Sequence, residues 1–157
     1  MEATPSRTAK HCTMADVVLD ANVLVGYFDQ NDALHRQALA VIQEVKETGD
    51  TPIMLDFLVA EAVSVLCRRT QQRKTNPPDL GAILADVKDI LEQGRINFVS
   101  ENVESRFGKV LDLVQRSNGV LNFHDATLLV SQEDGTIGPV ATFDEALARY
   151  PGFLAWD

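Results

Sequence analysis

Short apolar runs recur along the chain and predict buried β-strands. The first run, 17–19, reads Val-Val-Leu with no polar face, which is typical of a strand that is covered on both sides. Further runs of this kind predict strands at 52–56, 96–99 and 139–142, and 153–156 is a candidate edge strand. The pattern therefore predicts a sheet of four or five strands.

The segments between these runs carry apolar residues at helical spacing, three and four positions apart. They predict amphipathic helices at 34–45, 57–69, 80–91, 103–114 and 122–130, with a short helix after 144. Strands that alternate with helices imply right-handed crossovers and a mostly parallel sheet between helical layers. We therefore predict an α/β fold with a mostly parallel four- to five-stranded sheet.

Composition is that of one globular domain. The chain has 157 residues, of which 45% are hydrophobic and 24% charged. Residues 1–13 are polar and without periodicity, so we expect a disordered tail followed by a single domain over 14–157. No apolar run approaches the about 18 residues that a membrane helix needs, so we expect no contact with a membrane. Cys12 and Cys67 show no metal-binding spacing, which favours a cytoplasmic location.

The formal net charge of −9 argues against attraction of nucleic acid to the whole surface. If the protein binds RNA, a local group of cations must provide the contact. Arg68, Arg69, Arg73 and Lys74 form the best candidate RNA-binding patch. The alternative is that these cations only mark a solvated helix end, where positive charge is favourable.

Acidic residues stand at the ends of predicted strands and near the starts of predicted helices. Asp20 follows the first strand, Glu61 lies in the apolar second helix, Asp125 lies in a first helical turn, and Asp144 follows the fourth strand. Asp20, Asp125 and Asp144 have ordinary alternatives as helix-capping or dipole-stabilising residues, and Glu61 as a residue on an exposed stripe. Parallel topology, however, brings such positions to one edge of the sheet.

Carboxylates that meet at one point would repel each other. At about 6 Å and an effective dielectric constant of about 20, each pair costs roughly 3 kcal/mol, so the cluster requires cations. Hard oxygen ligands favour Mg²⁺ or Mn²⁺, which acidify a coordinated water and orient it for in-line attack on a phosphate. The predicted chemistry is phosphodiester hydrolysis without a serine, cysteine or histidine nucleophile.

These residues resemble the four acidic motifs of PIN-domain ribonucleases, and in particular the VapC-type toxins of toxin-antitoxin pairs. The resemblance rests on 19–24 (Leu-Asp-Ala-Asn-Val-Leu), on Glu61 in the helix after the second strand, on 122–126 (Asn-Phe-His-Asp-Ala) and on 142–144 (Thr-Phe-Asp). It covers nearly all of the chain from Met14 onward. The order and spacing of the motifs carry it, since each motif alone is one acid in an apolar context.

The resemblance implies a three-layer α/β/α PIN domain with the activity of a Mg²⁺- or Mn²⁺-dependent endoribonuclease toxin. It further implies a homodimer, an RNA substrate and inhibition by a cognate antitoxin. Asp20 and Asp125 would be the principal metal ligands of the catalytic site, which Glu61 and Asp144 would complete directly or through water. Asn22 and Thr142 are placed to hydrogen-bond these carboxylates or the scissile phosphate.

Two other functions compete with this interpretation. A phosphatase with Asp20 as its nucleophile would resemble the haloacid dehalogenases, but these need a second aspartate where this chain has Asn22. A non-catalytic PIN-like scaffold that binds RNA or protein is the other alternative, and the presence of all four acids argues against it. His124 is next to Asp125, but we expect it to point elsewhere on the helix, as a core or surface residue.

Overall fold

Four parallel strands form the sheet of the computed structural model, which describes residues 14–100 and 103–157. The predicted tail over 1–13 lies outside the described residues. The strands are β1 (Asp16–Leu19), β2 (Thr51–Leu55), β3 (Ile96–Asn97) and β4 (Val140–Ala141), in the order β3-β2-β1-β4. Val18 of β1 pairs with Ile53 on one side and with Val140 on the other. The prediction of a parallel sheet is confirmed.

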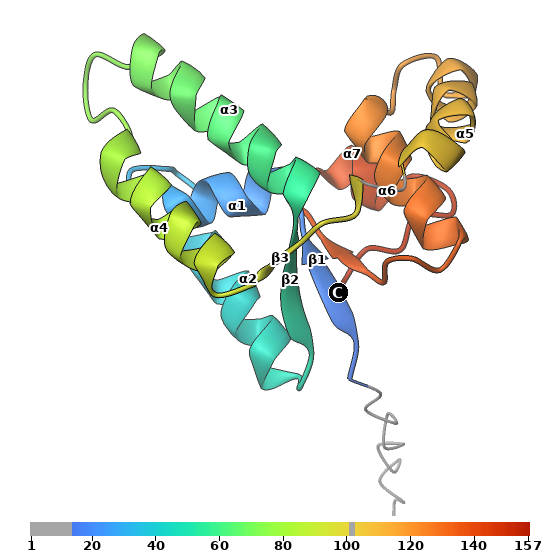
Figure 1. Cartoon of the computed structure of the whole chain (residues 1–157), viewed down its shortest axis with the longest axis horizontal. Helices are drawn as coiled ribbons and strands as arrows, with labels where there is room; N and C mark the ends of the chain where they lie inside the picture. The colour runs from blue at the N-terminus through green and yellow to red at the C-terminus, as the bar shows by residue number, and fades with distance from the viewer. Residues whose placement is uncertain (1–13, 101–102) are drawn as a thin grey trace, which may run out of the picture.

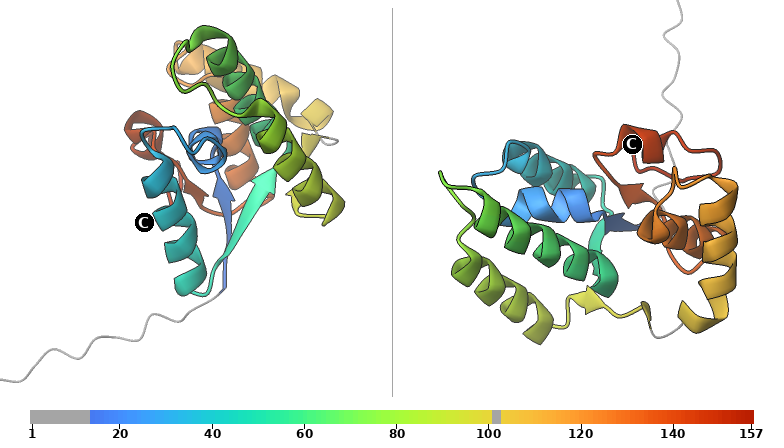
Figure 2. Two further views of the ribbon diagram at one scale, coloured as in Figure 1. Left: turned by 90° about the vertical axis from the view of Figure 1, so that its left-hand side faces the viewer. Right: turned by 90° about the horizontal axis from the view of Figure 1, so that it is seen from above.

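Helices cover both faces of this sheet. They are α1 (Ala21–Phe28), α2 (His35–Glu47), α3 (Asp56–Gln72), α4 (Leu80–Glu92), α5 (Val103–Arg116), α6 (Phe123–Glu133) and α7 (Glu145–Ala148). Figure 1 shows α1 to α4 on one side of the strands and α5 to α7 on the other, and Figure 2 shows β1 and β2 pointing the same way. The predicted three-layer α/β/α arrangement is confirmed.

The edges of the sheet are shorter than the sequence pattern predicts. Asp56, at the start of α3, accepts the backbone N–H of Val99 at 3.1 Å and a hydrogen bond from Ser100, so the predicted third strand ends after Asn97. The candidate strand at 153–156 contributes a single parallel bridge between Ala155 and Val140. Side-chain competition for backbone hydrogen bonds explains the shortening of β3.

The core is centred on β1, whose Val17, Val18 and Leu19 are at most 1% exposed. The next helix, α1, was not predicted, because its apolar residues read as a continuation of the apolar run. Asp20 begins that helix by accepting the N–H of Ala21. A fully buried strand thus delivers a carboxylate to the carboxyl edge of the sheet. Among the described residues, no helix has the length and apolar character required to cross a membrane.

Candidate active site

A cavity of about 230 Å³ lies between α1 and α3, beside the end of β1 and the starts of α6 and α7. All four predicted acids line it, and so does Asn22. Arg69, a member of the predicted basic patch, also lines the cavity. So does Asp32, which was not a predicted site residue. The structure therefore brings together carboxylates that are separated by up to 124 positions in the sequence.

Asp20 is fixed by hydrogen bonds to both of its carboxylate oxygens. Oδ1 accepts the N–H of Ala21 at 2.7 Å, and Oδ2 accepts the hydroxyl of Thr142 at 2.6 Å. The residue is only 7% exposed. These bonds hold the carboxylate in one orientation toward the cavity and compensate part of the cost of its burial.

Thr142 and Asn22 connect the first and the last acidic motifs. The Thr142 hydroxyl donates to Asp20 and accepts from Asn22 Nδ2 at 3.1 Å and from the backbone N–H of Asp144 at 3.0 Å. Asn22 Oδ1 in turn accepts the N–H of Phe143 at 3.1 Å. Thr142 therefore hydrogen-bonds the Asp20 carboxylate directly, whereas Asn22 is linked to that carboxylate only through Thr142.

Asp125 and Asp144 combine their place in the cavity wall with helix capping. Asp125 forms a capping box with Asn122 at the start of α6, accepting the Asn122 N–H at 3.2 Å. Asp144 caps α7 through Oδ1, which accepts the N–H groups of Ala146 and Leu147. The ordinary capping roles considered for these residues are thus real, and they coexist with convergence on one cavity.

Glu61 forms a side-chain contact with His124 that was not predicted from the sequence. His124 Nδ1 lies 2.8 Å from Glu61 Oε2, with the two side chains 40% and 32% exposed. This contact joins α6 to α3 and pairs His124 with one of the four acids, which its position next to Asp125 did not predict. The hydrogen bond to Glu61 raises the pKa of His124 above its ordinary value, which favours the protonated imidazole and an ion pair.

Burial and the nearby negative charges raise the pKa of two of the acids, Asp20 and Asp125. Burial raises the pKa of Asp20, and the charges of Glu61 and Asp144 add to that rise against the hydrogen bonds from Thr142 and Ala21. Burial, together with the charges of Asp20, Asp144 and Glu61, raises the pKa of Asp125 to about 6. A cation in the cavity would favour the ionised forms of Asp20 and Asp125, whose pKa values are raised by burial and by neighbouring negative charge.

The donor chemistry of the cavity suits a hard divalent cation, since its acidic wall offers carboxylate oxygens. Within the part of the chain that the structure describes, no three His, Cys, Asp or Glu side chains converge tightly enough to form a ready-made metal site. Mg²⁺ typically keeps several waters and takes only one or two protein carboxylates, so it does not require such a cluster. The residues fit an ion that is held partly by water.

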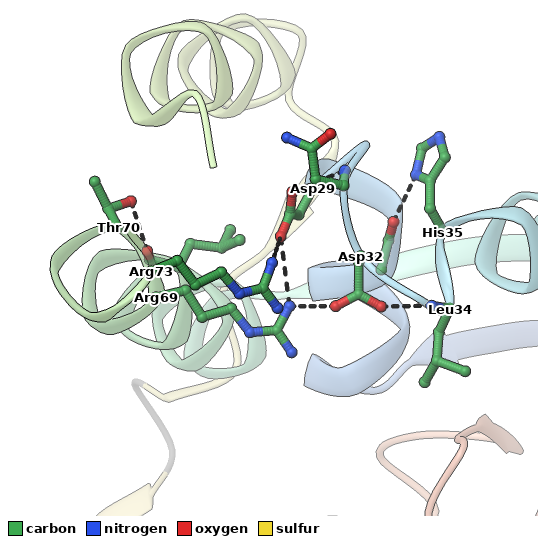
Figure 3. A network of polar contacts seen from close by, with 10 residues as sticks. Asp29, Asp32, Leu34, His35, Arg69, Thr70 and Arg73 are labelled. Atoms are coloured by element: carbon green, nitrogen blue, oxygen red, sulfur yellow. Dashed lines mark hydrogen bonds and ion pairs between the residues drawn. The ribbon is translucent and has the colours of Figure 1, made fainter. Parts of the chain in front are cut away.

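The predicted basic patch is divided between two environments. Arg69 and Arg73 reach from α3 toward the end of α1, where they pair with Asp29 and Asp32 (Figure 3). Arg69 lines the cavity, whereas Arg73 does not. Arg68 and Lys74 are exposed.

Comparison with protein families gives a match over most of the chain. The family model for the PIN domain matches residues 17–152, which include all four acids. No curated protein matches the chain significantly.

Solved structures share the fold. The crystal structure of VapBC2 from Rickettsia felis bound to a DNA fragment from their promoter is similar with a TM-score of 0.55 and 12% identity, over 90% of this chain and 99% of that chain. The crystal structure of PAE2754 from Pyrobaculum aerophilum is similar with a TM-score of 0.54 and 17% identity, over 90% of this chain and 83% of that chain. At these identities the likeness concerns the fold.

Proposed function

The chain belongs to the PIN domain family, whose members are generally nucleases that use divalent metal ions, and from this premise we propose that it is a Mg²⁺- or Mn²⁺-dependent endoribonuclease. The observation that carries the proposal is the convergence of Asp20, Glu61, Asp125 and Asp144 on one cavity at the carboxyl edge of the sheet. None of these acids is near another in the sequence, so their convergence has no local explanation.

In this proposal the residues of the cavity have different roles. Asp20 and Asp125 bind the ion, while Glu61 and Asp144 hold water molecules around it or bind it directly. Thr142 and Asn22 keep Asp20 and the start of α7 in register through their shared hydrogen bonds. When bound, the ion supplies an acidified water and neutralises charge on the phosphate.

Cleavage of single-stranded RNA tests the proposal. We expect cleavage in Mg²⁺ or Mn²⁺ that EDTA stops, and a loss of at least about 100-fold in Asp20→Asn and in Asp125→Asn, because removing one metal-binding carboxylate removes a charge that stabilises the transition state. Gel analysis of a labelled RNA measures this, and circular dichroism checks the fold of each variant.

The matched control is Asp112→Asn on α5, which makes the same chemical change at an exposed position outside the cavity. We expect it to cleave like the wild type. Full activity in both Asp20→Asn and Asp125→Asn would contradict the proposed mechanism.

We further propose that the protein is the toxin of a toxin-antitoxin pair. The likeness to VapBC2 of Rickettsia felis supports this, as do the motifs that resemble VapC-type toxins. A cognate antitoxin would then bind the chain and inhibit it, and the chain would form a homodimer. Expression in a bacterial host should arrest growth, Asp20→Asn should relieve the arrest, and co-expression of a small protein encoded next to this gene should do so as well.

The alternative function is a non-catalytic PIN-like scaffold that binds RNA or protein. Calorimetry distinguishes the two functions. The nuclease proposal expects Mn²⁺ to bind the wild type and to bind Asp20→Asn more weakly, whereas a scaffold would show no binding of Mn²⁺ to either.

A further inference from the structure

One guanidinium stands in the otherwise acidic wall of the cavity. Arg69, from the last turns of α3, is the only lysine or arginine among the described residues that line it. The same wall carries five carboxylates, the four predicted acids and Asp32. A nucleic acid backbone that approaches these carboxylates therefore meets a single protein cation there.

Two aspartates at the end of α1 hold this arginine in place, as Figure 3 shows. Arg69 Nη1 forms an ion pair with Asp32 Oδ2 and lies 3.5 Å from Asp29 Oδ2. The Asp29 side chain is 1% exposed and that of Asp32 is 7% exposed. The two aspartates are fixed in turn by the backbone, since Asp29 accepts the N–H of Asn31 and Asp32 accepts the N–H of Leu34.

All of these contacts use the same nitrogen of Arg69. Within the described part of the chain, Nη2 and Nε have no hydrogen-bond partner, and the side chain keeps 28% of its exposure. A guanidinium carries five N–H donors in a rigid fork, and two donors on one edge match the two oxygens of a phosphate. Arg69 thus has an unused edge on a side chain that is already oriented.

We propose that Arg69 is a substrate-binding residue that holds one phosphate of RNA beside the catalytic carboxylates through Nε and Nη2. Asp29 and Asp32 are its positioning residues. The inference rests on the proposed function, because it takes RNA as the substrate. It replaces the basic patch of four residues with one specific contact, since Arg73 is turned toward Asp29 at 3.3 Å and does not line the cavity.

The salt dependence of RNA binding tests this contact. A fluorescent single-stranded RNA is titrated with wild type, Arg69→Gln and Arg69→Lys at several KCl concentrations, in Ca²⁺ to keep cleavage low, and a gel verifies that the RNA is intact. We expect Arg69→Gln to bind about 10-fold or more weakly and to lower the slope of log K against log salt by about 0.7, the loss of one phosphate contact. Arg69→Lys keeps the charge and should retain most of the slope with weaker affinity, because it lacks the fork.

Arg106→Gln is the matched control. Arg106 also pairs with an aspartate, Asp134 at 2.6 Å, but it lies away from the cavity, so its variant should bind RNA like the wild type. A second readout locates the contact. A set of RNAs, each with one phosphate replaced by a neutral methylphosphonate, is bound to the wild type and to Arg69→Gln. One replacement near the cleavage site should weaken binding to the wild type, and the same replacement should not change binding to Arg69→Gln. If Arg69→Gln unfolds, Arg69→Lys tests the contact through its weaker affinity for RNA at a nearly unchanged slope.

The outcomes separate the two proposals. An unchanged salt slope in folded Arg69→Gln, wild-type affinity in Arg69→Lys, or no binding of RNA by the wild type would overturn the phosphate contact. The nuclease proposal is judged separately, by the effects of EDTA and of Asp20→Asn on cleavage. RNA binding that depends on Arg69 without any cleavage would keep this inference and remove the nuclease, whereas cleavage that is indifferent to Arg69 would do the reverse.

Discussion

At the scale of single residues, Asp125 shows how the cavity acids oppose folding in the absence of metal. Its pKa is raised to about 6, first by burial and then by the charges of Asp20, Asp144 and Glu61. A folded-state pKa above the ordinary value means that the protonated form is the one that favours the fold. Its contribution is complete below about pH 4 and is lost as the pH rises through about 6.

We therefore predict that Asp125→Asn stabilises the metal-free protein at pH 8 but not at pH 4. Asparagine carries no charge, and its carbonyl can still accept the Asn122 N–H of the capping box. The expected gain is about 1 kcal/mol, because solvent screening at this half-buried site reduces the effect of the shift. Urea unfolding in EDTA at both pH values measures it.

Asp112→Asn controls for the general effect of removing a negative charge and should show no such dependence on pH. Addition of Mg²⁺ at pH 8 should reverse the order, stabilising the wild type more than Asp125→Asn, since metal binding requires the deprotonated carboxylate. A variant that is less stable than the wild type in EDTA at pH 8 would contradict the electrostatic argument.

The sequence singled out Asp20, Asp125 and Asp144 because each lies beside a recognisable strand end or helix start. It singled out Glu61 because that residue is a charge inside an apolar helix. It could not predict the side-chain contacts between helices. The pair of His124 and Glu61 joins residues that are 63 positions apart, and it depends on how α3 and α6 pack. The ion pairs of Arg69 with Asp29 and Asp32 could not be predicted either, because both aspartates follow α1. That helix was not recognised in the sequence, since its residues continue the apolar run of β1.

At the scale of elements, the site is built from helix starts. Asp20 precedes α1, Asp125 lies in the first turn of α6, and Asp144 precedes α7, and each carboxylate accepts backbone N–H groups there. The positive end of the helix dipole favours a carboxylate at such positions. Helix starts thus fix the acids in place and offset part of their mutual repulsion.

Asp144 separates these structural and chemical roles. We predict that Asp144→Asn lowers RNA cleavage but leaves stability nearly unchanged, because an amide oxygen can still accept the N–H groups of Ala146 and Leu147. Asp144→Ala should lower cleavage as much and cost about 1 kcal/mol of unfolding free energy, the usual loss of a helix cap. Thermal unfolding and a cleavage assay on both variants measure the two effects.

A residue with only a capping role would give a different result. In that case Asp144→Asn would cleave RNA at the wild-type rate, and only Asp144→Ala would be impaired. Asp79 offers the comparison, since it caps α4 through the N–H of Ala82 at 3.1 Å and does not line the catalytic cavity. Asp79→Ala should lose stability and keep activity.

Element boundaries followed from the sequence where local signals were strong. Asn122 predicted the start of α6, and the capping box with Asp125 is present. The length of β3 could not be predicted, because the N–H of Val99 is taken by Asp56, a residue 43 positions earlier in the chain. Contacts of this kind depend on the assembled sheet and leave no local pattern.

At the scale of the whole molecule, the negative net charge limits where the proposed RNA substrate could bind. The net charge is −9, and a cavity lined by five carboxylates adds a local negative potential. Proteins that bind nucleic acid through a broad basic surface contact many phosphates and depend steeply on salt. In our proposals, a cation in the cavity and Arg69 would be the points where a phosphate is attracted.

We therefore predict that divalent cations control RNA affinity. At constant ionic strength, replacing EDTA with Ca²⁺ should raise the affinity of the wild type for single-stranded RNA by on the order of 10-fold, because the ion reverses the repulsion at the cavity. The double variant Asp20→Asn with Asp125→Asn removes two of the repelling charges and the principal ligands, so it should bind RNA with nearly equal affinity in both buffers. Fluorescence anisotropy measures both proteins. Equal affinity of the wild type in EDTA and Ca²⁺ would mean that RNA binds away from the cavity, because the proposed ion would lower the repulsion only there.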